Sequence, residues 1–351
     1  MNRHKHRNKL LFILKQREAN WGSYESKESG LSNSVRFVTD MLSREGVDAV
    51  VEQAIDNNCI DRLVTKHRPT HVIIEAFWVV PEKFDVLIPL HRDVQWIVRN
   101  HSETPFLANE GIAFGWVAEY LKRGVEVMCN SPRAVVDMVA YASACNQRTN
   151  LITYGPNVYP IPSIKRMDIL KDFDDEVINI GCFGAVRPLK NHMEQAVAAM
   201  LFADSVGKKL RFHINGSRIE GKGDPILKNI QEGFSHSHHE LVEHNWLNHE
   251  NFLKVLEHEI DIAMQVSFTE TFNIVAADAM SLGKPIVSSS EIPWLGDYSH
   301  VNPTNLMDIV QMLLTIYQES PRERLSRAYR QRMDMIHYVN VASSVWTKRF
   351  K

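Results

Sequence analysis

Short apolar runs alternate with helical patterns along the first part of the chain. Residues 10–14 form the first apolar run and predict a strand. In the segment that follows, Val35, Val38 and Leu42 recur at the spacing of one helix face, and residues 49–51 predict a second strand. Further strands are predicted at 72–76, 94–98, 125–128 and 151–154. This alternation is typical of a doubly wound α/β fold with a parallel sheet.

A proline-containing stretch separates this alternation from a second one. Pro156, Pro160 and Pro162 lie close together, and proline does not fit a central strand or a helix interior. Residues 155–171 are therefore predicted to end one domain and to link it to the next. Beyond them, strands are predicted at 178–183, 210–214, 241–242, 260–266 and 286–287, helices at 193–206, 252–256 and 306–317, and a terminal helix or helix pair at 322–350.

The composition fits two soluble α/β domains. The chain has 351 residues, of which 44% are hydrophobic and 23% charged, an ordinary globular balance. Its net charge of −2 gives no general attraction to nucleic acid or to an anionic membrane. The apolar run at 10–14 is too short for a membrane span or a signal sequence, so we expect no stable membrane insertion. Widely spaced cysteines favour buried free thiols in a reducing cytoplasm; they are Cys59, Cys129, Cys145 and Cys182.

The segment 267–289 carries the most specific chemistry in the chain. Glu270 precedes a predicted helix, and Asp278 lies about two turns into it by the helical period. Unpaired N–H groups at a helix start form a seat for a phosphate group. Two carboxylates that flank such a seat suit sugar and ribose hydroxyls on either side of a diphosphate. Besides Asp278, the predicted donor-binding residues here are those of the helix start, Thr271, Phe272, Asn273 and Ile274.

A basic turn at 182–192 follows a predicted strand and precedes a predicted helix. Gly184 lets the backbone come close to a ligand, and Arg187 and Lys190 place positive charge where a leaving diphosphate would need it. Alone, the turn is explained equally well as an ordinary strand–helix connection with solvated basic residues. The segment 267–289, one domain length away, favours the functional interpretation.

These two segments resemble the donor-binding elements of family-four glycosyltransferases, which have the GT-B fold. The family pattern is Ser-x-x-Glu-x-Phe-Gly, then Glu-Ala-Met, then Gly-x-Pro-Val. Here Asn273 replaces the glycine and Asp278 replaces the second glutamate. In the family's Gly-Arg-Leu-x-x-x-Lys turn, Lys190 aligns, whereas Arg187 lies two residues beyond the arginine position. The second domain is also similar to glycosyltransferases carried by tailed phages. The matching positions are Ser267, Glu270, Phe272, Ala279, Met280, Gly283, Pro285 and Val287.

The resemblance implies two Rossmann-like domains that face a cleft, at 1–165 and 175–324, with the last helix at about 325–351 packing back on the first. It implies a retaining glycosyltransferase that uses a nucleotide sugar as co-substrate and has no obligatory metal or other cofactor. Lys190 and Arg187 would stabilise the departing diphosphate, Glu270 would hold sugar hydroxyls and Asp278 the ribose. Trp246 falls where relatives bind the base, so it is predicted to stack on the base or else to be a core tryptophan.

The first domain contributes weaker candidates. Gly30 begins a segment that resembles the family's glycine-rich first loop, although a helix N-cap would explain it without a ligand. His101 follows the fourth predicted strand, where ligands gather in open α/β sheets, and family members often have a histidine here that contacts the sugar. Glu75 lies at the end of the third strand and Trp78 just after it; both are candidates for binding the acceptor, with a buried aromatic cluster as the alternative.

The sequence leaves the acceptor open among a saccharide, a small molecule and a modified DNA base, the last because some phage enzymes of this type act on DNA. An epimerase-like nucleotide-sugar enzyme, or a protein that only binds sugar nucleotides, is the alternative function. The expected location is the cytoplasm, the host's if the chain is phage-encoded. A histidine-rich tract at 236–258 could indicate zinc, but no cysteine or acid framework completes a site, so no metal is predicted. DNA contact would need a basic cluster, either Arg62, Lys66, His67 and Arg68, or Arg92 with Arg99.

Overall fold

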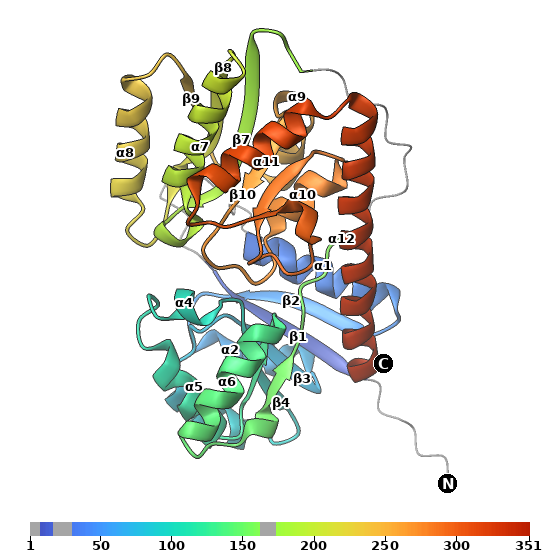
Figure 1. Ribbon diagram of the computed structural model, residues 1–351. Helices are drawn as coiled ribbons and strands as arrows, with labels where there is room; N and C mark the ends of the chain where they lie inside the picture. The colour runs from blue at the N-terminus through green and yellow to red at the C-terminus, as the bar shows by residue number, and fades with distance from the viewer. Residues whose placement is uncertain (1–7, 17–29, 162–172) are drawn as a thin grey trace. The chain divides into compact units, whose positions relative to one another are not determined.

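The computed structural model describes residues 8–16, 30–161 and 173–351 (Figure 1). The chain divides into two compact units. The first comprises the described residues up to Pro160 together with Val339–Lys351, and the second those from Ile161 to Tyr338. Among the described residues each unit contains one six-stranded parallel sheet, so the predicted α/β class with two doubly wound sheets is confirmed.

The first unit has the sheet order β2-β1-β3-β4-β5-β6. Each strand predicted from the apolar runs is present, with ends shifted by one to three residues. The strands are β1 (Lys9–Lys15), β2 (Asp48–Ala54), β3 (His71–Glu75), β4 (Gln95–Asn100), β5 (Glu126–Cys129) and β6 (Ile152–Tyr154). The helices are α1 (Gly30–Arg44), α2 (Cys59–His67), α3 (Phe84–Leu90), α4 (Thr104–Leu107), α5 (Ala113–Lys122) and α6 (Pro132–Ala144), with short 3₁₀ turns at Pro81–Lys83 and Thr149–Leu151.

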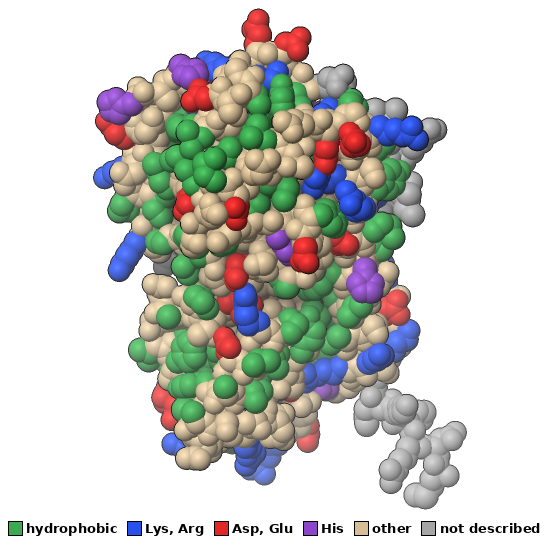
Figure 2. Space-filling model, in the orientation of Figure 1, with side chains coloured by type: hydrophobic (Ala, Val, Ile, Leu, Met, Phe, Trp, Pro, Cys, Tyr) green, Lys and Arg blue, Asp and Glu red, His purple; other side chains and the backbone are tan. Residues whose placement is uncertain are grey.

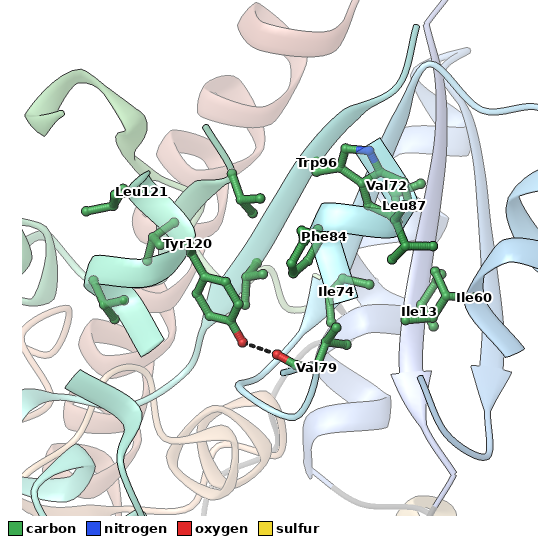
Figure 3. Close-up of a cluster of buried hydrophobic side chains, with 14 of the residues drawn as sticks. Ile13, Ile60, Val72, Ile74, Val79, Phe84, Leu87, Trp96, Tyr120 and Leu121 are labelled. Carbon is green, nitrogen blue, oxygen red and sulfur yellow. Dashed lines mark hydrogen bonds between the residues drawn. The ribbon is translucent and has the colours of Figure 1, made fainter. Parts of the chain in front are cut away.

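Alternate strand residues of the first unit enter two separate layers, because successive side chains of a strand point to opposite faces. One layer is drawn in Figure 3, where Tyr120 of α5 also donates a hydrogen bond to the carbonyl oxygen of Val79. On the opposite face Phe12 packs against Trp346, 6.0 Å between ring centroids. The layer in Figure 3 combines Ile13, Val72, Ile74 and Trp96 of the strands with Ile60, Phe84, Leu87 and Leu121 of the helices.

The second unit repeats this arrangement with the order β12-β11-β10-β7-β8-β9. Its strands are β7 (Val177–Val186), β8 (Lys209–Ile219), β9 (Glu240–Glu243), β10 (Ile262–Gln265), β11 (Ile286–Ser289) and β12 (His300–Val301). Its helices are α7 (His192–Ser205), α8 (Asp224–Ser235), α9 (His249–Glu259), α10 (Ile274–Ser281), α11 (Leu306–Gln318) and most of α12 (Pro321–Phe350), with 3₁₀ turns η3 (Pro188–Lys190) and η4 (Asp297–Ser299).

Buried side chains again divide between the two faces of the sheet. Ile180 and Phe212 pack with residues of α7, α8 and α11, whereas Phe183 packs with Leu256 and partly buried residues of α9 and α10. Strands β7 and β10 are neighbours in the middle of this sheet. The loops that follow their carboxyl ends therefore meet at one edge of the sheet.

Two sequence predictions about glycines are wrong in detail. Gly184 lies inside β7 rather than in the turn after it, with a φ of 117° at a register shift between β7 and β8. Such a bulge with positive φ favours glycine. Gly30 begins α1 instead of preceding it. The buried side chains of Asn33 and Ser34 extend the packed face of the helix by one turn toward its amino end. The other residues of the predicted first loop, 31–34, also lie in α1.

Candidate functional site

Lys190 and Glu270 come together at the carboxyl ends of β7 and β10. Lys190 is the last residue of η3, which follows β7, and Glu270 lies in the loop that leads from β10 to α10. The Lys190 Nζ donates a hydrogen bond to the Glu270 Oε1, and the two side chains are only 12% and 9% exposed. Both residues were predicted to lie at a diphosphate site, and in the structure they are in direct contact.

Neutral donors complete the surroundings of the Glu270 carboxylate. Ser267 Oγ and Asn273 Nδ2 also donate to Oε1, at 2.8 and 3.0 Å. Asn273 Nδ2 reaches Gln265 Oε1 as well, at 2.8 Å, and Gln265 Nε2 donates to the carbonyl oxygen of Phe183 at 2.9 Å. A nearly buried carboxylate with a cation and two neutral donors is fixed in position.

Asn273 stands where the glycosyltransferase pattern has glycine, and its backbone takes a conformation that favours glycine. Its φ is 63°, in the left-handed region where glycine fits best and asparagine is tolerated next. Its side-chain oxygen accepts the N–H of Ala276 at 3.0 Å and so caps α10. An asparagine therefore takes the glycine conformation and adds a cap.

Helix α10 begins at Ile274, the last residue of the predicted helix start at 271–274. Thr271 lies in the preceding loop. Phe272 is buried, stacks on Trp294 with ring centroids 5.4 Å apart, and accepts the Trp294 indole N–H at its carbonyl oxygen. Its ring therefore belongs to the core.

Asp278, the second carboxylate of the motif, is bonded to an imidazole that the sequence analysis did not connect with it. Asp278 is 2% exposed, and its Oδ1 lies 2.7 Å from the Nε2 of His249. His249 is the first residue of α9, directly after the N-cap Asn248. The only sequence signal for His249 was its place in the histidine-rich tract, which pointed to zinc rather than to a carboxylate.

Arg187 and Trp246 are connected through Glu220 and Arg218, which the sequence did not indicate. The Arg187 Nη1 is 3.4 Å from Glu220 Oε2, and Arg218 bonds the other oxygen of Glu220 through Nε at 2.8 Å. The Arg218 guanidinium also lies 4.0 Å from the centroid of the Trp246 ring. Trp246 is half-buried and so is not a core tryptophan. Its backbone N–H donates to Ser217 Oγ at 2.8 Å, which anchors this loop.

In the first unit, Glu75 and His101 contact each other at the carboxyl ends of β3 and β4. The His101 Nε2 is hydrogen-bonded to Glu75 Oε2, and Arg99 approaches the other oxygen of Glu75 at 3.5 Å. Glu75 is 1% exposed and enclosed by these groups, so the predicted direct contact with an acceptor does not fit its position. Trp78, the other acceptor candidate, packs against the core of the unit.

Solved structures with the same arrangement cover nearly the whole chain. The N-terminal domain of a trehalose-6-phosphate phosphatase from Candida albicans is 10% identical, with a TM-score of 0.73 over 100% of this chain and 98% of that one. An α,α-trehalose-phosphate synthase (UDP-forming) from Burkholderia vietnamiensis is 10% identical, with a TM-score of 0.68 and coverages of 99% and 98%. An Anabaena protein in complex with UDP-glucose is 11% identical, with a TM-score of 0.60 and coverages of 97% and 99%. This chain has the GT-B fold.

No protein-family model and no curated protein matches the sequence of this chain, so the comparisons of sequence assign it to no family. Within the described ranges, no helix is both long enough and apolar enough to cross a membrane.

The basic residues proposed for DNA contact do not gather at the carboxyl edge of the first GT-B sheet. Lys66 and His67 end α2 and Arg68 follows it, next to the amino end of β3, and Arg92 precedes β4. Arg99 is fully buried, which rules out the predicted contact with a DNA backbone. On the face shown in Figure 2, basic and acidic side chains are interspersed, which does not favour a polyanion.

The histidine-rich tract contributes to two clusters in the second GT-B unit, contrary to the expectation that no acid accompanies it. One contains Asp204, His238 and His239, and the other His213, His244 and Glu259. Hydrogen bonds occupy some of the ring nitrogens in these clusters, whereas the buried His239 Nε2, 3.4 Å from Asp204 Oδ1, has no hydrogen-bond partner among the described residues. His239 Nδ1 accepts the N–H of Leu210 at 3.1 Å, and His213 Nδ1 lies 2.9 Å from His244 Nε2. That the protein needs no metal stays a prediction.

His192, the first residue of α7, is a buried imidazole directly beyond the lysine turn. Neither ring nitrogen has a hydrogen-bond partner among the described residues, and burial lowers the pKa of His192 to about 3. The unfolded chain, with an ordinary histidine pKa near 6.5, therefore takes up this proton first as the pH falls. The stability that the neutral imidazole contributes is complete above pH 6.5 and is lost between pH 6.5 and about 3.

We expect the substitution His192→Leu to flatten this pH dependence. The wild-type protein should lose about 1.4 kcal/mol of unfolding free energy for each pH unit below about 6 through this group alone. Urea unfolding at several pH values between neutral and about 5 measures the slope. His236→Leu is the control, because the His236 side chain is 76% exposed. Equal slopes in wild type and His192→Leu would contradict a neutral buried His192.

Proposed function

We propose that this protein is a glycosyltransferase that takes its sugar from a nucleotide-sugar donor. The contact between Lys190 and Glu270 carries the proposal. It places a fixed cation and a fixed carboxylate beside the start of α10, at the sheet edge where open α/β folds bind their ligands. Solved structures with this fold include the Anabaena protein in complex with UDP-glucose and an E. coli structure bound with UDP-2-fluoro glucose.

The second unit would bind the donor, because it supplies positively charged groups for the diphosphate and carboxylates that can accept hydrogen bonds from hydroxyls. Lys190 and the N–H groups at the start of α10 would neutralise the charge that develops on the leaving diphosphate. Glu270 would accept hydrogen bonds from sugar hydroxyls while Ser267 and Asn273 keep it in place. Asp278 would hold the ribose hydroxyls in the same way.

The remaining donor contacts follow from the loops around this centre. Arg187 would add positive charge, partly offset by its partner Glu220. Trp246, with Arg218 on its ring, would offer a flat surface for the base. In the first unit His101 would contact a substrate hydroxyl. From the resemblance of segment 267–289 we also infer retention of the anomeric configuration. A saccharide or small-molecule acceptor is favoured because the basic candidates for DNA contact do not gather at the carboxyl edge of the first sheet, and Arg99 is buried.

Binding of a panel of nucleotide sugars tests this proposal directly. UDP-, GDP-, ADP- and dTDP-linked sugars would each be added to the whole protein in a thermal-shift assay, followed by calorimetry for the best donor. A ligand at about 100 times its dissociation constant stabilises a protein by about 2.7 kcal/mol. We therefore expect a clear rise in melting temperature for one nucleotide class. No rise with any of them would overturn the proposal.

Product analysis with the best donor separates transfer from other chemistry. Release of the nucleoside diphosphate with a sugar attached to an added acceptor supports a transferase, and the anomeric configuration of the product tests retention. An epimerised donor, formed without any acceptor, would instead support an epimerase-like enzyme.

A further inference from the structure

His213, His244 and Glu259 form a cluster of possible metal ligands in the second unit. His213 lies in β8, His244 directly follows β9, and Glu259 is the last residue of α9. One ring nitrogen of each histidine and one carboxylate oxygen of Glu259 all lie within 4.8 Å of one another. Two imidazoles and a carboxylate therefore meet where three separate elements of the unit come together.

Asn179 of β7 fixes the orientation of the buried His213 ring. Its amide Nδ2 lies 3.1 Å from Asp261 Oδ2, and a carboxylate oxygen only accepts hydrogen bonds. Asn179 therefore turns its Oδ1 toward His213, whose Nε2 lies 3.3 Å away. Since an amide oxygen also only accepts, the Nε2 of His213 carries the hydrogen of the neutral ring.

The other nitrogen of His213 then offers its lone pair to the cluster. His213 Nδ1 lies 2.9 Å from His244 Nε2, so the two rings share one hydrogen, and His244 supplies it. Burial, together with the neighbouring His244 and Arg211, lowers the pKa of His213 to about 4, which agrees with a neutral ring. Metal-ligating histidines generally donate their second ring N–H to an oxygen, as His213 does to Asn179.

Glu259 is available to an ion at the same place. It is exposed, and no hydrogen bond or ion pair holds its carboxylate among the residues that the structure describes. Burial lowers the pKa of the half-buried His244, and the nearby charge of Glu259 opposes this effect. An ion from solvent can therefore reach the two imidazoles past Glu259.

The chemistry of these ligands favours zinc over magnesium or calcium. Imidazole nitrogen suits Zn²⁺, whereas Mg²⁺ and Ca²⁺ prefer oxygen. Zinc–nitrogen bonds of about 2.0–2.1 Å in a tetrahedral site place two ligand nitrogens about 3.3 Å apart. The facing nitrogens would thus separate by about 0.4 Å from their present 2.9 Å. Asn179 holds His213, so the half-buried His244 would make this movement, and a water molecule would complete the tetrahedron.

We propose that His213, His244 and Glu259 bind one Zn²⁺ ion that joins β8, the loop after β9 and the end of α9. The ion takes the place of the hydrogen between the rings, and that hydrogen moves through water from His244 Nε2 to Nδ1 of the same ring. The role is structural, because the anchored loop carries Trp246 two residues beyond His244. The prediction that sugar transfer needs no metal is unaffected, and the inference does not rest on the proposed function.

The other histidine cluster, Asp204, His238 and His239, provides the matched control because it lacks a suitable lone pair. His239 Nδ1 accepts the N–H of Leu210 at 3.1 Å, so the hydrogen of the neutral ring is on Nε2, which faces Asp204 at 3.4 Å. That nitrogen could bind an ion only after the bond to Leu210 was lost. His238 is 68% exposed, so His238→Gln removes a histidine of this cluster without disturbing the core.

Calorimetric titration of Zn²⁺ into the whole protein, first treated with a chelator, tests the site without any nucleotide sugar. We expect one tightly bound ion per chain in the wild type and in His238→Gln. Losing an outer-shell partner alone weakens metal binding by roughly 10- to 100-fold, so Glu259→Gln and His244→Gln should each weaken it by at least about 10-fold. Glu259→Gln changes only an exposed side chain, so it should fold even if His244→Gln does not.

Co²⁺ in place of Zn²⁺ gives an independent measure of the geometry, because four-coordinate Co²⁺ absorbs visible light much more strongly than the hydrated ion. We expect this absorption in the wild type and in His238→Gln, and its loss in His244→Gln. A wild type that binds no zinc, or an equal affinity in wild type and Glu259→Gln, would overturn the proposal. The second result would assign the zinc to surface histidines. Neither result bears on the proposed function, which the panel of nucleotide sugars decides.

Discussion

Replacing Lys190 with alanine is expected to lower the turnover of a nucleotide sugar by about 10²- to 10³-fold. Lys190 is the cation bonded to Glu270, at the place where the diphosphate would leave. Removing one fixed group that stabilises developing charge in an enclosed site has an effect of this size. The affinity for the free nucleoside diphosphate should fall as well, because the same charge attracts the product. Steady-state kinetics and calorimetry measure the two effects.

A surface lysine–glutamate pair of the same unit separates this effect from a general loss of charge. Lys209 Nζ lies 3.4 Å from Glu240 Oε2, and both side chains are nearly half exposed. Lys209→Ala should therefore leave turnover unchanged, since exposed ion pairs contribute little. Lys190→Arg would restore the charge without the geometry and should recover only part of the rate. Wild-type turnover in Lys190→Ala would exclude the contact with Glu270 as the centre of the site.

The positions of the site residues follow from topology that the sequence reveals well. Apolar runs fixed the strands, and in a parallel sheet the loops after neighbouring strands meet at one edge. Lys190 and Glu270 each followed such a run, so their meeting needed only the adjacency of β7 and β10. The order of strands within a sheet is not written in local patterns, and only the structure shows it.

Partners formed between elements distant in the sequence were harder to predict. His249 meets Asp278 because α9 and α10 pack side by side on one face of the sheet, and no periodicity marks that pairing. The partial burial of Trp246 by Arg218 depends in the same way on β8 extending beyond its apolar core into 215–219. Polar residues at the end of a long strand resemble a loop, so the apolar pattern ended the strand too early.

Glu75 shows a different limit of sequence reasoning. A glutamate at the end of a strand was expected to face a ligand, but Arg99 of β4 and His101 directly after it enclose the carboxylate. Arg99 is drawn inward by the carbonyl oxygens of Gly155 and Pro156, and its charge then favours a buried carboxylate beside it. Glu75 and His101 were candidates because of their residue types and positions. Their burial, which the sequence does not show, distinguishes the enclosed carboxylate from the partly exposed imidazole.

Replacing Trp346 with alanine is expected to destabilise the first unit by about 3–5 kcal/mol. Trp346 lies near the end of α12 and is 1% exposed. Its ring packs on Phe12, and its indole N–H donates to Pro156 O at 2.8 Å. The space around it is filled so closely that a Cβ on Gly155 would lie 3.3 Å from the Trp346 ring. Truncation would therefore leave a cavity next to β1 and remove one of the two hydrogen bonds that Pro156 O accepts, the other coming from Arg99 Nη2.

Urea unfolding of the whole protein, followed by far-UV circular dichroism, measures this change. Val341→Ala is the control on the same helix, because Val341 is 51% exposed and should shift the unfolding free energy by less than about 0.5 kcal/mol. The indole also lies 5.1 Å from the Arg99 guanidinium, so its loss would loosen the residue that compensates Glu75. Trp346→Ala should accordingly reduce turnover even below the onset of unfolding. An unfolding curve equal to that of Val341→Ala would show that the last turns of α12 do not belong to the core of the first unit.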